Sequence, residues 1–302
     1  MKILITGVTG QLGYDVAREA EHRGHEVIGV GRATDTYCRN YIQCDITNEG
    51  DVYRMMAAVH PDVVIHCAAW TDVNGAEENW NECIKVNYTA TIYIARAAAL
   101  VEAKMLYVST DYVFGAHFDE EASPIPADIY PHYSYAVNTY GMSKAMGENA
   151  VRDIIKEHFI VRISWVFGSN GKNFVKTMLN LADKHGDPVV VNDQIGRPTY
   201  TVDAARLFID MVETDKYGTY NATNEGDYVT WFGFAQKIYE ISGKFWMTVK
   251  PKMTENDGFS VVKRQKNSML DTSKLRLAGF EPLPSWEDAC RRFLEEINEI
   301  RS

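Results

Sequence analysis

The chain has 302 residues, 46% hydrophobic and 24% charged, which is enough for two globular domains and excludes disorder and low-complexity scaffolds. Its 31 basic and 41 acidic residues give a net charge of −10, so we expect no nucleic-acid partner. The five cysteines contain no C-x-x-C pair, and neither a leader nor a long apolar run is present, so we expect a cytoplasmic protein without a membrane partner.

Up to residue 165, short apolar runs alternate with longer helical patterns, which is typical of βαβ units. The expected strands are Lys2–Thr6, His25–Val30, Tyr41–Cys44, Asp62–Cys67, Lys104–Ser109 and Phe159–Ser164. The expected helices are Gln11–Arg23, Glu49–Val59, Asn79–Val101 and Thr139–Lys156. This repetition predicts an α/β fold with a Rossmann-type doubly wound parallel sheet.

After Trp165 the pattern is looser, with helices expected at about 201–213, 230–242 and 285–300. We expect a dinucleotide-binding domain over 1–165, rejoined by about 199–222. A smaller, discontinuous substrate-binding lobe is expected over 166–302. The polar loop 116–138, with three prolines and several tyrosines, has a length that usually marks a functional loop.

A glycine-rich turn follows the first expected strand. Gly7, Gly10 and Gly13 allow a tight turn and let a pyrophosphate approach the free N–H groups that begin the first helix. Gln11 and Leu12 lie in the same turn and belong to the predicted cofactor site. The alternative is a glycine-rich turn that binds nothing.

Cofactor choice is expected at the ends of the second and third strands. Arg32 could accept a 2′-phosphate, which favours NADPH while leaving NADH possible, although an exposed arginine without a ligand is the alternative. Asp45 resembles an acceptor for the adenine edge, with Ile46 beside it. Asp45 could equally be a carboxylate near the N-cap of the next helix.

Tyr140 and Lys144 are four residues apart in an expected helix and therefore share one face. No other tyrosine in the chain has lysine at this spacing. A neighbouring cation is expected to lower the pKa of the phenol toward the range useful for proton transfer. An exposed pair on a helix surface is the alternative.

The segment Ser109-Thr110-Asp111-Tyr112 places hydroxyls at the carboxyl end of a central strand, where α/β sheets bind ligands. A hydroxyl there could hydrogen-bond a reacting carbonyl. A Ser/Thr turn that satisfies its own backbone is the alternative.

In this order, the motifs resemble the extended short-chain dehydrogenase/reductases and, within them, the dTDP-4-dehydrorhamnose reductase family. The similarity covers nearly the whole chain through the segments 7–13, 68–71, 109–114, 140–144, 164–168, 192–199 and 267–271. It implies that Thr110, Tyr140 and Lys144 form a catalytic triad. It also implies that NAD(P)H reduces the C4 ketone of a nucleotide-linked 6-deoxy-4-keto sugar, converting dTDP-4-dehydro-L-rhamnose to dTDP-L-rhamnose.

The same resemblance implies a role for each of these groups. Tyr140 would donate the proton, Lys144 would hold the nicotinamide ribose, and Thr110 would bind the carbonyl oxygen. Ala68 and Ala69 would contact the cofactor. The implied substrate site comprises Thr71, Val73, Thr110, Asp111, Tyr112, Trp165, Asn192 and Gln194.

The resemblance leaves metal and assembly open. Some family members hold Mg²⁺ at a dimer contact, and Asp15 resembles one such position, but the remaining ligands cannot be assigned and no metal is expected. A monomer or a homodimer is expected.

Some features depart from the family pattern. Asn74-Gly75 replace a more usual Asp and larger residue, the tyrosine-rich loop is long, and Gln265 follows Arg264 where proline is common. Tyr112 after Asp111 disfavours a 4,6-dehydratase. A nucleotide-sugar epimerase remains an alternative, as does a cofactor-binding regulatory subunit similar to the methionine adenosyltransferase β subunit.

Overall fold

The protein is described by a computed structural model that covers residues 1–300 except 35, 121–122, 185 and 257–261. Its centre is a seven-stranded sheet in the order β11-β6-β5-β4-β1-β2-β3, with every neighbouring pair parallel. The strands are β1 (Lys2–Thr6), β2 (Glu26–Gly31), β3 (Tyr41–Gln43), β4 (Val63–His66), β5 (Lys104–Thr110), β6 (His158–Ile163) and β11 (Gly218–Asn221). The predicted Rossmann-type parallel sheet is therefore confirmed.

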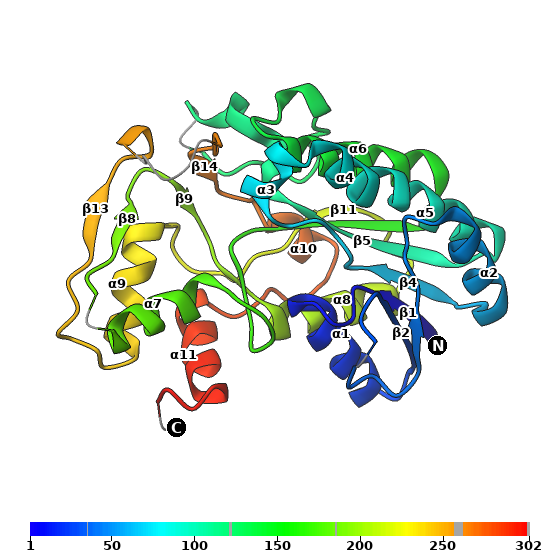
Figure 1. Cartoon of the computed structure of the whole chain (residues 1–302), viewed down its shortest axis with the longest axis horizontal. Coiled ribbons are helices and arrows are strands. Elements are labelled where there is room, and N and C mark those ends of the chain that lie inside the picture. Colours follow the sequence, from blue (N-terminus) through cyan, green and yellow to red (C-terminus); the bar gives the residue numbers. More distant parts are fainter. Residues whose placement is uncertain (35, 121–122, 185, 257–261, 301–302) are drawn as a thin grey trace.

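Helices cover both faces of this sheet (Figure 1). On one face lie α1 (Gln11–His22) and α8 (Thr201–Val212), and on the other α2 (Glu49–Val59), α5 (Ala90–Leu100) and α6 (Thr139–Ile154). Ile3 and Ile5 pack into the core that the sheet forms with α1 and α8, and Leu4 packs into the core that it forms with α2, α5 and α6. They differ because successive side chains of a strand point to opposite faces. Strand order reverses between β1 and β4, and ligands bind at such a switch point.

The helix expected over 79–101 is interrupted. It consists of α4 (Trp80–Ile84), a π-helical turn (Lys85–Thr89) and α5. Asn87, in that turn, is buried and holds both backbone polar groups of Trp70, at 2.7 and 3.0 Å. Apolar periodicity cannot reveal one extra residue in a helical turn, and π-turns of this kind often occur at functional sites.

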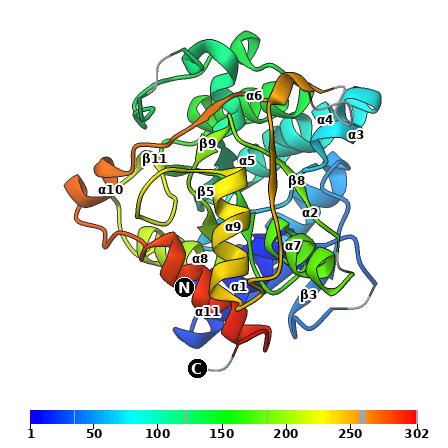
Figure 2. The same ribbon diagram turned by 90° about the vertical axis from the view of Figure 1, so that its left-hand side faces the viewer.

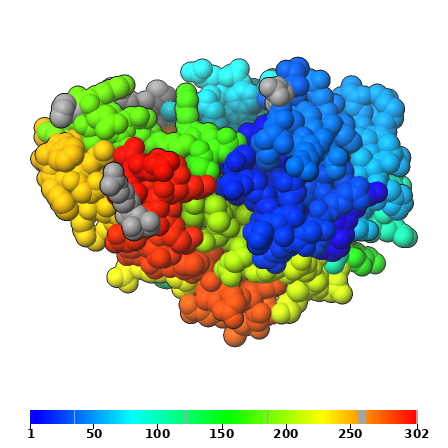
Figure 3. Space-filling model, turned by 90° about the horizontal axis from the view of Figure 1, so that it is seen from below, coloured from blue at the N-terminus to red at the C-terminus, as the bar shows by residue number. Residues whose placement is uncertain are grey.

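Most of the chain after Trp165, apart from α8 and β11, forms a lobe beside the sheet (Figures 1 and 2). Its core lies among α7 (Phe174–Asp183), α9 (Trp231–Ile241) and α11 (Trp286–Glu296), and includes Phe234 and Phe293. Its strands are β7 (Val166–Phe167), β8 (Val189–Val191), β9 (Ile195–Gly196), β10 (Thr199–Tyr200), β12 (Val229–Thr230), β13 (Lys250–Lys252) and β14 (Asn267–Ser268). From below, the blue N-terminal part of the chain and the yellow and red parts of the lobe lie side by side (Figure 3).

Several short elements were not expected. They are α3 (Val73–Glu78), α7, α10 (Ser273–Leu277), the seven short strands of the lobe and 3₁₀ turns at Asp111–Phe118, Tyr133–Tyr135 and Thr254–Asn256. Within the segment expected to rejoin the first domain at about 199–222, β11 pairs with β6 at the edge of the main sheet. The division of the chain into domains at residue 165 stays a prediction. Over the described residues, no helix is both long and apolar enough to cross a bilayer.

Candidate active site

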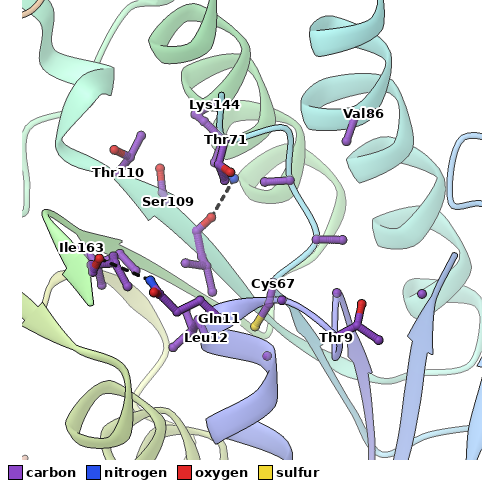
Figure 4. A pocket seen from close by; sticks show the side chains of 18 of the residues that line it. Thr9, Gln11, Leu12, Cys67, Thr71, Val86, Ser109, Thr110, Lys144 and Ile163 are labelled. Atoms are coloured by element: carbon purple, nitrogen blue, oxygen red, sulfur yellow. Dashed lines mark hydrogen bonds between the residues drawn. The ribbon is translucent and has the colours of Figure 1, made fainter. Parts of the chain in front are cut away.

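A cavity of about 690 Å³ opens at the carboxyl ends of the central strands. Its lining side chains come from the glycine turn, the end of β5, helix α6 and the segment after β6 (Figure 4). Carboxyl ends of parallel strands meet at one edge of a sheet, so residues far apart in sequence converge there.

The glycine turn forms one wall. Gly7 has a φ of +69°, and a Cβ built on it would lie 2.7 Å from the backbone nitrogen of Ala68. A Cβ on Gly13 would lie 2.3 Å from the carbonyl oxygen of Gly7. Both positions therefore require glycine, and the tight turn aims the N-terminus of α1, whose first N–H groups have no partner within the helix, at the cavity.

Arg32 and Asp45 line the cavity at the ends of β2 and β3. Asp45 accepts hydrogen bonds from the backbone nitrogen and hydroxyl of Thr47, at 3.0 and 2.9 Å. These bonds and the Arg32 charge lower the pKa of Asp45. The Asp45 carboxylate is therefore ionised at neutral pH and can accept a hydrogen bond from an amino group.

Tyr140 and Lys144 both lie in the first half of α6 and line the cavity. Asn138 caps this helix by accepting a 2.8 Å bond from the backbone nitrogen of Gly141. Lys144 is only 3% exposed. Its Nζ donates to the carbonyl oxygen of Val108 at 2.7 Å and lies 4.0 Å from the centre of the Tyr107 ring.

The expectation that Lys144 lowers the pKa of Tyr140 is wrong. Burial raises the pKa of Tyr140, and a hydrogen bond with Thr110 opposes this increase only in part. Burial also lowers the pKa of Lys144 to about 7. Tyr140 is therefore a protonated phenol at neutral pH.

Thr110 lies beside this pair and is 6% exposed. Its hydroxyl donates to Oδ1 of Asp111 at 2.9 Å and accepts from the backbone nitrogen of Tyr112 at 3.3 Å. Burial raises the pKa of Asp111 to about 6. The Tyr112 ring meets the Tyr140 ring edge to face at 5.6 Å, so the two rings bound one part of the cavity.

The cavity brings together all predicted catalytic and cofactor residues and most predicted substrate residues. Asn192 and Gln194 are not among its lining residues. Asn192 accepts a 2.8 Å bond from Thr230, and Gln194 donates a 3.1 Å bond to Thr254, both within the lobe. Their role in sugar binding stays a prediction.

Further lining residues were not in the predicted site: Thr9, Val30, Gly31, Ala33, Cys44, Thr47, Cys67, Val86, Val108, Ser109, Ile163, Ser164, Val166 and Lys172. Most of them flank a predicted residue or end a strand. The rule that α/β sheets bind ligands at the carboxyl ends of their strands, here called the strand-end rule, could therefore have found them. Lys172 carried no such signal. It lies in a segment where the Asn170 side chain donates to the carbonyl oxygens of Thr9 and Gly10, at 3.0 and 3.1 Å.

Trp165 lines the cavity from the lobe side with a φ of +51°, a left-handed backbone uncommon outside glycine. Its ring stacks on Trp231, with centroids 3.8 Å apart. The stacked pair connects the cavity to the aromatic core of the lobe.

The chain is similar to proteins of one family along nearly all its length. The family model described as "RmlD substrate binding domain" matches residues 1–299. A dTDP-4-dehydrorhamnose reductase from Mycobacterium tuberculosis is 36% identical over 290 residues, covering 95% of this chain and 90% of that protein.

Solved structures agree with the family match. A dTDP-4-dehydrorhamnose reductase from Bacillus anthracis, solved in complex with NADP, has a TM-score of 0.86 at 34% identity and covers 98% of each chain. A structure from Clostridium acetobutylicum, also described as a dTDP-4-dehydrorhamnose reductase, has a TM-score of 0.89 at 34% identity, covering 99% of this chain and all of that one. The chain therefore belongs to the RmlD substrate-binding family, that of the dTDP-4-dehydrorhamnose reductases.

Proposed function

We propose that this protein is an NADPH-dependent reductase that converts the C4 ketone of dTDP-4-dehydro-L-rhamnose to the alcohol of dTDP-L-rhamnose. The observation that carries the proposal is one cavity lined by the glycine turn, Arg32, Thr110, Tyr140 and Lys144. Relatives at 34–36% identity are dTDP-4-dehydrorhamnose reductases, and one was solved with NADP.

The lining residues fit a phosphorylated dinucleotide. The N-terminus of α1 offers N–H groups to a pyrophosphate, and the exposed Arg32 offers a cation for a 2′-phosphate. Asp45 offers an ionised acceptor, and Ala68 and Ala69 offer a small apolar wall. When bound, NADPH supplies the hydride that reduces the ketone carbon.

Tyr140 supplies the proton that the reduced oxygen requires. Because burial raises its pKa, the phenol keeps its proton until negative charge develops on the substrate oxygen. The Thr110 hydroxyl, which donates to Asp111 in this structure, would turn to hydrogen-bond the same oxygen when substrate binds. Preplaced donors of this kind stabilise the developing alkoxide.

In its protonated form, Lys144 is a cation beside the reaction. Its bond to the Val108 carbonyl orients the ammonium, and its charge favours negative charge nearby. With a pKa near 7, Lys144 can also return a proton to Tyr140 between turnovers. Asp111, Tyr112 and Trp165 complete the proposed sugar pocket, together with Thr71 and Val73.

The assay mixes purified protein with NADPH and dTDP-4-dehydro-L-rhamnose and follows both the absorbance of NADPH and the nucleotide sugar by mass spectrometry. We expect one NADPH oxidised for each dTDP-L-rhamnose formed. An isomeric nucleotide sugar without net NADPH oxidation would instead identify an epimerase. Tight NADPH binding without any product would identify a cofactor-binding regulatory subunit.

We also propose a cytoplasmic monomer or homodimer whose partner is the nucleotide-linked sugar. Light scattering after size exclusion measures the mass, expected as 34.2 kDa or twice that value. Cell fractionation tests the location.

A further inference from the structure

Helix α6 carries a buried carboxylate that the proposed reaction does not use. Glu148 lies one turn beyond Lys144 and is 0% exposed. Its Oε1 accepts from the Ser109 hydroxyl at 2.6 Å and from Nε of Arg162 at 2.8 Å. Its Oε2 accepts from Nη2 of Arg162 at 2.8 Å and from Arg152.

The partners of Glu148 belong to the strands that frame the cavity. Ser109 directly precedes Thr110 on β5, and Arg162 precedes the lining residue Ile163 on β6. Arg162 is itself fully buried and also donates to the carbonyl oxygen of Ala127 at 3.0 Å. Glu148 therefore links the catalytic helix to both strands.

Glu148 is an anion in this setting. Burial raises its pKa, but the charge and hydrogen bonds of Arg162, with help from Arg152 and Ser109, outweigh burial and lower the pKa to about 2. A buried carboxylate held by two guanidinium groups therefore stays ionised at neutral pH.

A nearby anion favours the charged form of Lys144, because burial lowers the pKa of this side chain. The titratable groups that act on Lys144 or face it are Glu148 on its own helix, Cys83 on α4, His66 and Cys67 at the end of β4, and Tyr107 on β5. Tyr140 lies on the same helix and lines the same cavity. Burial raises the pKa of Cys67, Cys83, Tyr107 and Tyr140 and lowers that of His66, so these groups are neutral near pH 7. Glu148 lies one turn from Lys144 on the same helix, and the two side chains bond neighbouring residues of β5, Ser109 and Val108. Of the titratable groups around Lys144, Glu148 raises its pKa most.

We propose that Glu148 is a positioning residue that keeps the Lys144 ammonium charged and, through Ser109, holds Thr110 beside Tyr140. The inference rests on the proposed function, since it assigns Glu148 a part in that reaction. A merely structural carboxylate would fasten α6 to the sheet without affecting the charge on Lys144.

The test compares Glu148→Gln, which removes the negative charge, with Ser109→Ala, which removes a hydrogen bond to Glu148 and leaves its charge. Glu148→Gln keeps the size and one acceptor oxygen but removes the charge, so Lys144 should lose its proton about one to two pH units earlier. The alkaline limb of the pH profile of kcat should move to lower pH by the same amount. Ser109→Ala removes one hydrogen bond to Glu148 but leaves the carboxylate charged. It should therefore lower kcat without moving the alkaline limb of the pH profile.

The second readout needs no turnover. ¹³C NMR of labelled lysine side chains gives the titration of Lys144 directly, with its resonance assigned by its loss in Lys144→Met. We expect the midpoint to fall in Glu148→Gln and to stay unchanged in Ser109→Ala. An unchanged midpoint in Glu148→Gln overturns the proposal whether or not the protein reduces the keto sugar.

A second variant guards against misfolding. Glu148→Gln leaves Arg162 as a buried cation without its full partner, whereas replacing both Glu148 and Arg162 by Met removes the pair together, which is often tolerated. The double variant should show the same early titration of Lys144. Titration at the wild-type midpoint in the double variant overturns the proposal. Absence of NADPH oxidation by wild type, with the NMR shift present, rejects only the proposed reaction.

Discussion

The two halves of the chain contribute unequally to the cavity. Most lining residues precede residue 165 and lie at or near the ends of the parallel strands, whereas the rest of the chain contributes Trp165, Val166 and Lys172. Strands of one parallel sheet present their carboxyl ends at a common edge, so sequence position predicts location. The lobe has strands of two or three residues in separate small sheets, which share no such edge.

The largest expected effect is at Tyr140, the proposed proton donor in the N-terminal half. Tyr140→Phe keeps the ring but removes the proton donor, so turnover should fall by about 100-fold or more while NADPH still binds. Steady-state kinetics and fluorescence titration with NADPH measure the two effects. Unchanged turnover would remove Tyr140 from the mechanism.

The matched control is Tyr112→Phe, which changes the neighbouring ring in the same cavity. Its hydroxyl has no assigned step, so kcat should change by less than about tenfold. Equal losses in both variants would show that the tyrosine pair matters for packing rather than for proton transfer.

The packing of α8 against α1 on one face of the sheet can be tested through Asp15. This carboxyl on α1 is buried and accepts a hydrogen bond from Thr201, the first residue of α8. Burial raises its pKa from 3.8 to about 6. Between these two values the folded protein holds a proton that the unfolded chain has lost, so this group makes the free energy of unfolding fall as pH rises.

Asp15→Asn should remove that dependence and increase the free energy of unfolding above pH 6 by about 2–3 kcal/mol, at about 1.4 kcal/mol per pH unit. Urea unfolding at several pH values, in buffer with a chelator, measures the difference from wild type. Thr201→Val should act oppositely by removing a bond that lowers the pKa. A wild-type pH slope in Asp15→Asn would show that the contact does not couple folding to protonation.

The sequence predicts the sheet and most of its site because glycine turns, strand ends and the Tyr-Lys spacing are local signals. Three features have no local signal in the sequence. The π-turn around Asn87 shifts the helix by one residue without changing apolar composition, and the burial that sets the pKa of Tyr140 depends on tertiary packing. Lys172 reaches the cavity because Asn170 binds the glycine turn, a contact spanning 160 residues.

Arg32 tests whether the strand-end rule also predicts cofactor choice. Arg32→Ala should raise KM for NADPH by about 10- to 100-fold, the value of one charged hydrogen bond, with little effect on NADH. Initial rates with each cofactor measure the ratio. Arg39→Ala, an exposed arginine that does not line the cavity, is the control and should leave both KM values unchanged. Equal losses with both cofactors in Arg32→Ala would indicate a folding defect.

The smallest expected change in KM is at Asn192 in the lobe, and this residue also tests most directly whether the lobe contributes to the site. Asn192 already bonds Thr230 within the lobe, so Asn192→Ala should change KM for the nucleotide sugar by less than about fivefold, equivalent to about 1 kcal/mol. Trp165→Ala removes a lining ring stacked on Trp231 and should raise the same KM by about tenfold or more. A larger effect at Asn192 than at Trp165 would mean that substrate draws the segment 192–199 into the cavity. The lobe would then contribute by closing on its ligand, and its role could not be inferred from strand order.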